Sequence, residues 1–280
     1  MISACLEFHS SLDEKHHSLR QSSIRLFGIK ALANSENQPE RLLVTVATYN
    51  ERENLPTLVE EIFRYAPQAE ILVIDDNSPD GTGDWCDEQA ETNPKLHCLH
   101  REGKLGLGTA IVAGMQYALE HNYDYVLNMD ADFSHHPRHL PALIEGMNPA
   151  DGPPRDVMIG SRYIPGGKIE GWGFKRHFMS KAINLYSRWL LWLSPKDCSG
   201  SYRCYRTELL RKIDLGKIRS RGYSFQEEIL WRCRRAGALM AETPITFADR
   251  ERGVSKIDNS EAFSALRIIF SLGLRNLMPR

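Results

Sequence analysis

Two aspartates two positions apart, Asp130 and Asp132, are the clearest sign of chemistry in this sequence. They stand in the segment NMDADFSHHP, directly after the apolar run at residues 125–129. Such a run predicts a buried strand, whose end would place both carboxylates at the rim of a sheet. Mg²⁺ and Mn²⁺ usually bind proteins through one or two carboxylates together with substrate phosphates. The pair alone is also typical of a solvated turn, so its interpretation depends on the surrounding motifs.

The elements that would position these carboxylates alternate between strand and helix from residue 41 onward. Short apolar runs predict strands at residues 42–47, 71–74, 96–99, 125–129 and 156–159. Helical spacing of apolar residues predicts helices at 55–66, 84–91 and 109–120, the first with Asn54 as N-cap. This alternation indicates an α/β fold with a mostly parallel sheet. Ligands of such sheets bind beyond the carboxyl ends of the strands, where the polar segments 48–54, 75–81 and 130–137 fall.

The second half of the sequence adds longer predicted helices and a set of arginines. The helices are expected at residues 175–193, 223–234 and 262–274, with a turn and a short strand within 197–206. The arginines lie beside glycine, serine or aromatic residues, and they are Arg162, Arg176, Arg250 and Arg252. A single arginine is usually a solvated surface group, but guanidinium groups bind phosphate through two parallel hydrogen bonds. Several of them downstream of an acidic pair indicate an anion site, to which Ser180, Ser255 and Lys256 could add donors.

Two further turns suit either a ligand or the fold itself. Asp75 and Asp76 end a predicted strand, where they could accept hydrogen bonds from a nucleotide or cap a turn. Residues 103–108, GKLGLG, lead into a predicted helix and allow a close approach of the backbone to a ligand or the sheet. They match neither the Walker A pattern nor G-x-G-x-x-G, so a dinucleotide-binding interpretation is poor.

Composition narrows the classes of protein. A net charge of −1 gives no basic field for nucleic acid. The six cysteines form no C-x-x-C pair, so reduced thiols are expected and a zinc site is not. No run reaches the roughly 20 apolar residues of a membrane span, and residues 1–6 do not form a signal core. Residues 1–40 are predicted to be an extension of low order, 41–256 one domain, and 257–280 an amphipathic helix that packs on that domain or rests on a membrane.

The motifs, taken in order, resemble those of dolichol-phosphate (polyprenyl-phosphate) mannosyltransferases. These are inverting members of glycosyltransferase family 2 with a GT-A fold, a Rossmann-like nucleotide-sugar-binding sheet flanked by helices. The resemblance runs from about residue 42 to residue 256 through ATYNERENLP, DDNSPDGT, KLGLGTA, MDADFSHHP, GSRY, GWGFKR, DCSGSYRCYR, GYSFQEE and DRERGVSK. Nine motifs in the same order make it specific at the level of the family.

The resemblance implies a role for each matching residue. Asp130 and Asp132 would hold Mg²⁺ or Mn²⁺, and Asp132 would act in catalysis with Arg162 and Arg250. The nucleotide-sugar pocket would consist of Ala47, Tyr49, Glu51, Asp76, Asp130 and Ala131. The acceptor phosphate would be bound by Arg162, Arg176, Ser180, Arg250 and Lys256. The chain departs from some members at Ala47, where they have proline, and at Ser134, where they have glutamine near the metal.

The implied reaction moves mannose from GDP-mannose to a polyprenyl or dolichyl phosphate with inversion of the anomeric carbon. A phosphate nucleophile is already anionic at neutral pH, so no strong general base is required. The implied location is the cytoplasmic face of a membrane, held peripherally, and a membrane-anchoring subunit is left open as a partner. One alternative is the same fold with UDP-glucose or UDP-GlcNAc as donor. Another is a non-catalytic regulatory subunit, against which the intact aspartate pair and arginines argue.

Overall fold

A computed structural model describes residues 40–249, except 221 and 223, and residues 259–277, of which 259–264 and 277 as backbone alone. The predicted extension at residues 1–40 therefore lies almost entirely outside the described residues. Arg250, Arg252, Ser255 and Lys256 lie outside them as well.

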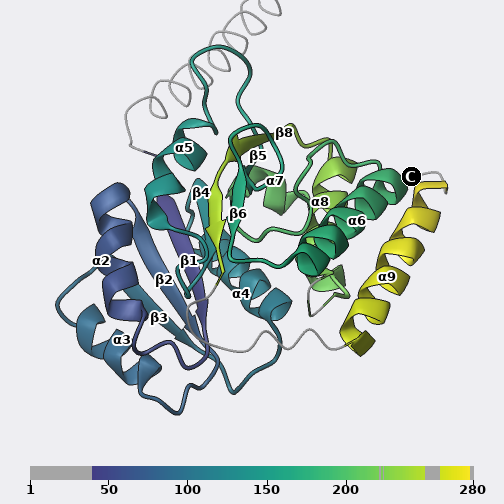
Figure 1. The fold of residues 1–280 in the computed structure, drawn as a ribbon. Helices are drawn as coiled ribbons and strands as arrows, with labels where there is room; N and C mark the ends of the chain where they lie inside the picture. Colours follow the sequence, from purple (N-terminus) through teal and green to yellow (C-terminus); the bar gives the residue numbers. More distant parts are fainter. Residues whose placement is uncertain (1–39, 221, 223, 250–258, 278–280) are drawn as a thin grey trace, which may run out of the picture. The chain divides into compact units, whose positions relative to one another are not determined.

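A seven-stranded sheet forms the centre of the described structure (Figure 1). Its strands lie in the order β3 (Leu96–His100), β2 (Glu70–Asp75), β1 (Leu42–Thr48), β4 (Tyr125–Asp130), β7 (Arg203–Arg206), β5 (Val157–Ser161) and β8 (Met240–Pro244). Only β7 runs antiparallel to its neighbours, β4 and β5. The mostly parallel α/β sheet predicted from the sequence is therefore confirmed.

Helices cover both faces of this sheet, because the inner strands present apolar side chains alternately to each side. One face packs against α2 (Leu55–Tyr65), α3 (Thr82–Ala90) and α5 (Leu140–Glu145). The other packs against α4 (Leu107–Glu120), α7 (Thr207–Arg211) and α8 (Phe225–Arg235). Asn54 stands at the predicted N-cap of α2 but makes no capping bond, since its Nδ2 donates to Glu51 Oε2 at 2.8 Å.

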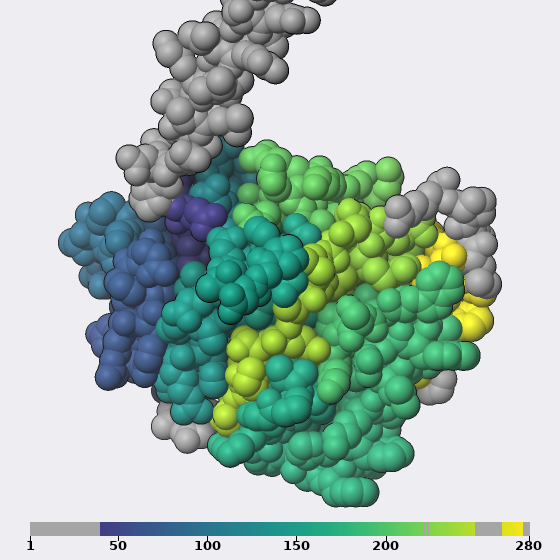
Figure 2. Space-filling model, turned by 90° about the horizontal axis from the view of Figure 1, so that it is seen from above, coloured from purple at the N-terminus to yellow at the C-terminus, as the bar shows by residue number. Residues whose placement is uncertain are grey.

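A smaller layer stands beside the carboxyl end of the sheet. It consists of two short parallel strands, β6 (Lys168–Glu170) and β9 (Thr246–Ala248), together with α6 (Phe174–Leu191). Strand β9 forms a bridge from Phe247 to His135, which ties this layer to the loop after β4. In Figure 2 the yellow-green segment that contains β8 and β9 runs between the teal residues and green α6.

Helix α9 (Asn259–Leu274) lies alongside α6 and contacts α8 (Figure 1). Its Ile269 and Leu272 are buried in the core, whereas Phe270 and Leu274 are exposed. Three short 3₁₀ turns complete the described elements, at Pro137–His139, Leu215–Lys217 and Arg275–Leu277. Among the described residues, no helix combines the length and the apolar character that crossing a bilayer requires.

Candidate active site

The three polar loops predicted to share one rim do so, because β1, β2 and β4 are adjacent and parallel. In this register Ala47 lies opposite Asp130, and Thr48 opposite Asp75. Each loop contains one non-glycine residue with a left-handed backbone: Asn50 at φ 61°, Asn77 at φ 59° and Phe133 at φ 58°. Asparagine adopts this conformation readily, but phenylalanine does so rarely. The strained turn therefore directly follows the aspartate pair, where strain often accompanies function.

Hydrogen bonds from two serines hold the aspartate pair in place. Asp130 Oδ1 accepts from the Ser201 hydroxyl at 2.8 Å, and Asp132 Oδ1 accepts from the Ser134 backbone N–H at 3.0 Å. Both aspartates are half-buried, and Ala131 between them is buried. The two carboxylates thus stand at the end of β4 with their orientation set by neighbours.

His135 is a buried support for Asp130. Its Nδ1 accepts from the Asp130 backbone N–H at 3.2 Å, so the ring is neutral with its proton on Nε2. Burial lowers the pKa of His135, against the opposing pull of Asp130 and Asp132. The ring stacks on Tyr202 at 4.9 Å and meets Phe247 edge-on at 5.4 Å. We infer that His135 fixes the loop that carries the carboxylates.

The residues present fit a hard divalent cation. Asp130 and Asp132 offer carboxylate oxygens at one rim, which is the donor type of Mg²⁺ and Mn²⁺ sites. The Ser134 hydroxyl beside them is buried and has no hydrogen-bond partner in the described structure. An orphaned buried oxygen is unusual in proteins and marks a place where a ligand or water completes the contacts. When bound, the cation would offset negative charge that develops on a departing diphosphate.

Asp76 lies in a second, positively charged part of the rim. Its carboxylate forms an ion pair with Arg101 at 2.9 Å, and both side chains are about nine-tenths buried. Burial raises the pKa of Asp76, although Arg101 opposes this. Lys104, from the glycine-rich segment, stands over the half-exposed ring of Tyr49 at 4.6 Å. The structure therefore brings Tyr49 and Asp76 next to two cations to which the sequence interpretation gave no role.

Asp75 and Glu51 take part in turn geometry at the same rim. The carboxylate of Asp75 accepts from the Ser78 backbone N–H at 3.0 Å, the Ser78 hydroxyl at 2.5 Å and Thr48 Oγ1 at 3.1 Å. The sequence allowed Asp75 either to bind a nucleotide or to cap a turn, and in the structure its carboxylate caps the turn. The backbone N–H of Glu51 donates to Thr82 Oγ1 at 3.2 Å, which fastens the loop after β1 to the start of α3.

Arg162, Arg176 and Ser180 gather on the other side of the aspartate pair. The guanidinium carbons of Arg162 and Arg176 lie 5.6 Å and 4.2 Å from the centre of the Trp172 ring. Ser180 accepts a hydrogen bond of 2.7 Å from the hydroxyl of Tyr163, which follows Arg162 in the chain. Arg162, Arg176 and Ser180, which the sequence predicted to bind an anion, therefore lie close together in the structure. We name this group, Arg162, Tyr163, Trp172, Arg176 and Ser180, the arginine cluster.

Arg162 is held by a buried carboxylate that the sequence interpretation did not single out. Asp197 is fully buried and accepts from Arg162 Nε and Nη2, both at 2.7 Å. Arg162 Nη2 also donates to the Ser199 hydroxyl at 2.8 Å. Burial would lower the pKa of Arg162, but Asp197 outweighs it and the pKa is raised. Asp197 therefore keeps a charged guanidinium oriented at the edge of the site.

Arg176 is less buried and pairs with Asp249, the last described residue before Arg250. Its Nη1 lies 2.8 Å and 2.9 Å from the two carboxylate oxygens. The indole N–H of Trp172, under the Arg176 guanidinium, is buried and has no partner among the described residues. A buried donor beside two guanidinium groups suits an anion that would accept from all three. The predicted roles of Arg250 and Lys256 fall outside the described residues.

Comparison with known proteins defines the class first. The model of glycosyl transferase family 2 matches residues 43–214, so the chain belongs to this family and is a glycosyltransferase. A structure of glucosyl-3-phosphoglycerate synthase from Mycobacterium tuberculosis, solved with Mn²⁺, UDP-glucose and phosphoglyceric acid, has a TM-score of 0.56 and 15% identity over 86% of this chain and 81% of that one. It shares the fold, which confirms the predicted GT-A architecture.

Two curated relatives then confirm the resemblance drawn from the nine motifs. Polyprenol monophosphomannose synthase from Mycolicibacterium smegmatis is 43% identical over 242 residues, which cover 86% of this chain and 90% of the relative. Undecaprenyl-phosphate mannosyltransferase from Micrococcus luteus is 44% identical over 234 residues, which cover 84% and 94%.

Proposed function

We propose that this protein transfers mannose from GDP-mannose to a polyprenyl or dolichyl phosphate, with inversion and with Mg²⁺ or Mn²⁺ as cofactor. The observation that carries the proposal is the position of the aspartate pair at the end of β4, between Tyr49 and Asp76 on one side and the arginine cluster on the other. The two named relatives support mannose as the sugar and a polyprenyl phosphate as the acceptor.

The donor would occupy the rim formed by β1, β2 and β4. The Tyr49 ring and the Asp76 carboxylate would bind the base and ribose, with Glu51, Ala47 and Ala131 as the pocket wall. Asp130 and Asp132 would hold the cation that neutralises the diphosphate. His135 and Ser201 keep Asp130 oriented, so little reorganisation is needed when the donor arrives.

The acceptor phosphate would occupy the arginine cluster. Two guanidinium groups and the Trp172 N–H would hold the phosphate dianion against repulsion by the donor diphosphate. A phosphate oxygen already carries the lone pair that attacks the anomeric carbon, and the diphosphate leaves with the bonding electrons. A single displacement of this kind inverts the anomeric carbon, and no residue of the chain has to remove a proton.

A lipid acceptor requires a membrane-facing surface, and α6 provides one beside the arginine cluster. Apart from Met179, its exposed large apolar residues are Phe174, Phe178, Leu185 and Trp189, followed by Trp192 at the C-cap. This spacing puts them on one stripe of the helix, whereas Arg176 and Ser180 lie on the opposite side. The stripe continues on neighbouring α9 with Leu266, Phe270 and Leu274, and exposed Lys175 and Lys181 flank its start.

We therefore propose that the α6–α9 face rests on a membrane, on its cytoplasmic side as the family resemblance implies. An apolar stripe with flanking lysines is typical of helices that lie in the plane of a membrane interface. The lipid tail of the acceptor would stay in the bilayer while its phosphate reaches the arginine cluster across one helix diameter. This arrangement does not require a membrane-anchoring subunit.

A donor panel tests the proposal. The purified chain is incubated with a short-chain polyprenyl phosphate and radiolabelled GDP-mannose, UDP-glucose or UDP-GlcNAc, each with Mn²⁺ or Mg²⁺. The proposal predicts labelled lipid from GDP-mannose alone. Product from a UDP-sugar alone would retain the fold and the acceptor but refute the donor, and product with no polyprenyl phosphate added would refute the acceptor.

A further inference from the structure

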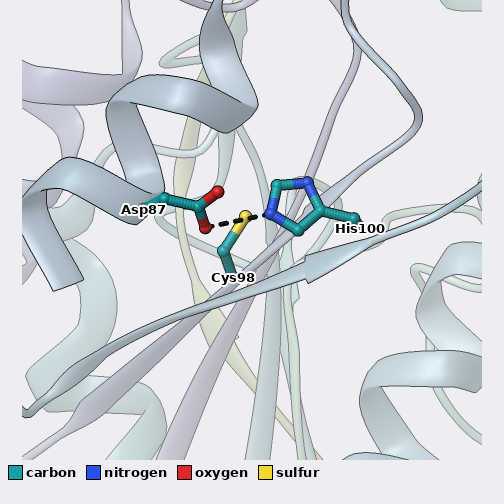
Figure 3. A group of neighbouring side chains, drawn as sticks. All are labelled: Asp87, Cys98 and His100. Carbon is teal, nitrogen blue, oxygen red and sulfur yellow. Dashed lines mark hydrogen bonds and ion pairs between the residues drawn. The ribbon is translucent and has the colours of Figure 1, made fainter. Parts of the chain in front are cut away.

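A second group of metal-binding side chains lies away from the active site, where α3 packs on the edge strand β3. Asp87 comes from α3, and Cys98 and His100 come from the same face of β3 (Figure 3). One ligand atom from each of the three side chains lies within 4.8 Å of the other two. Asp87 Oδ1 and His100 Nε2 are already 2.9 Å apart. Three different ligand types thus point to one place.

The donor set selects a different metal from the aspartate pair. A thiolate, an imidazole and a carboxylate are the ligands of Zn²⁺, at about 2.0–2.3 Å each, whereas Mg²⁺ and Mn²⁺ favour oxygen alone. Tetrahedral geometry at those bond lengths puts neighbouring ligand atoms roughly 3.4–3.8 Å apart. The Asp87–His100 pair at 2.9 Å is closer than that range and the whole group spans no more than 4.8 Å, so small side-chain adjustments would seat the ion. The side chains of Asp87 and His100 are 59% and 51% exposed, so an ion can enter from solvent.

A second thiol adjoins the group. Contact with the Cys86 thiol, together with burial, raises the pKa of the Cys98 thiol. Cys86 precedes Asp87 in α3, is fully buried, and donates a weak hydrogen bond to the His97 carbonyl at 3.7 Å. Cys86 thus contacts Cys98 from the buried side, while the exposed side leaves room for water as a further ligand. Binding of an ion would displace the Cys98 proton, because metal-bound thiols are deprotonated.

The other nitrogen of the His100 imidazole, Nδ1, lies near the backbone of Gly83, as does the Asp75 carboxylate. A Cβ atom added at Gly83 would lie 3.0 Å from Asp75 Oδ2 and 3.2 Å from His100 Nδ1. Both groups therefore face the same spot, and only glycine leaves room for them there. Asp75 belongs to the turn that leads into Asp76, so the group around His100 is connected to the donor side of the rim.

We propose that Asp87, Cys98 and His100 form a Zn²⁺ site that fastens α3 to the edge strand β3. The ion would replace the single hydrogen bond between Asp87 and His100 with a three-point attachment, completed by water. The loop between β2 and α3, which carries Asp76, would be held at both ends. The sequence does not predict this site, because its ligands belong to different elements and no C-x-x-C pair marks them.

Binding of Zn²⁺ alone to the full chain tests the site, without any sugar donor or lipid. The chain is reduced, freed of metal with a chelator and titrated with Zn²⁺, and Co²⁺ is used as a spectroscopic substitute. We expect about one Zn²⁺ per chain, a thiolate-to-Co²⁺ absorption band in the near ultraviolet, and a rise in Tm with Zn²⁺. Cys98→Ser should abolish the band and, like His100→Ala, weaken Zn²⁺ binding by at least about tenfold.

Asp84→Asn is the matched control, because Asp84 is an exposed acid on the same helix outside the group. It should bind Zn²⁺ as the wild type does, and so should Asp132→Ala if the aspartate pair is a separate site. Equal Zn²⁺ affinity in wild type and Cys98→Ser, or no saturable binding, would overturn the proposal. A Cys86–Cys98 disulfide found without reductant and needed for the fold would overturn it too. None of these outcomes depends on mannosyl transfer.

Discussion

Asp197→Ala should be among the most destabilising single changes in the described structure, because it leaves a buried guanidinium without its counter-charge. Four donors lose an acceptor: the backbone N–H, Nε and Nη2 of Arg162 and the backbone N–H of Gly200. Asp197 is fully buried and the Arg162 side chain is 6% exposed, so water cannot replace the carboxylate. Removing one partner of such a pair typically costs about 3–5 kcal/mol.

Urea unfolding followed by tryptophan fluorescence measures this cost. A loss of about 4 kcal/mol would lower Tm by roughly 8–16 °C for a domain of this size. Asp197→Asn keeps one acceptor oxygen and should lose less, about 2 kcal/mol. Asp214→Ala is the matched control, since Asp214 pairs with Lys217 at 2.8 Å in an exposed setting where water replaces the lost partner and little change in stability is expected.

The milder variant, Asp197→Asn, also tests the role of Arg162 in acceptor binding. At a temperature where Asp197→Asn stays folded, a disordered Arg162 should raise the KM for the polyprenyl phosphate more than the KM for the donor. A cost for Asp197→Ala as small as that of Asp214→Ala would refute the inference that the pair is desolvated. Equal changes in both KM values would refute the placement of Arg162 at the acceptor.

Three further outcomes follow from the packing. Burial raises the pKa of Glu227 to about 7, so the folded state keeps a proton that the unfolded state loses near pH 4.5, and stability falls between those values as pH rises. Glu227→Gln should therefore stabilise the protein at pH 8 by on the order of 3 kcal/mol and little at pH 5, and an equal gain at both would contradict the assignment. Gly108→Ala should cost about 1–3 kcal/mol, because its Cβ would lie 2.9 Å from Phe225 Cβ and Cγ, whereas Gly103→Ala, with nothing within 4 Å, should be neutral in urea unfolding. Trp189→Glu, at a residue 75% exposed, should leave Tm unchanged but reduce sedimentation with phosphatidylglycerol vesicles, and undiminished sedimentation would exclude the α6–α9 face as the membrane contact.

Local sequence patterns were sufficient for the elements that carry the donor side of the site. The apolar runs of β1, β2 and β4 are buried along nearly their whole length, so their type and their ends are visible in the sequence. The elements that escaped prediction lack such a pattern. Strand β8 has the polar sequence MAETP at the sheet edge, β6 has three residues, and α5 has six with a proline.

The sequence interpretation missed the site residues whose roles depend on contacts between segments far apart in the chain. Arg162 was singled out because its residue type suits phosphate, but its partner Asp197 lies 35 positions away and no periodicity links them. Trp172 became informative only when the end of β5 and the start of α6 placed the guanidinium groups of Arg162 and Arg176 over its ring. Lys104 was visible in the glycine-rich segment, yet its contact with Tyr49 depends on the crossover that brings that segment over β1.

The most direct test of the central claim is transfer of radiolabelled mannose from GDP-mannose to a polyprenyl phosphate by wild type and Asp132→Ala, with a chelator and after Mn²⁺ is added back. The account predicts lipid-linked mannose from the wild type, its loss with the chelator, its recovery with Mn²⁺, and none from Asp132→Ala at any Mn²⁺ concentration while the variant keeps the wild-type Tm. Undiminished transfer in the chelator, or by folded Asp132→Ala, would contradict the assignment of a metal-dependent transfer site to the end of β4.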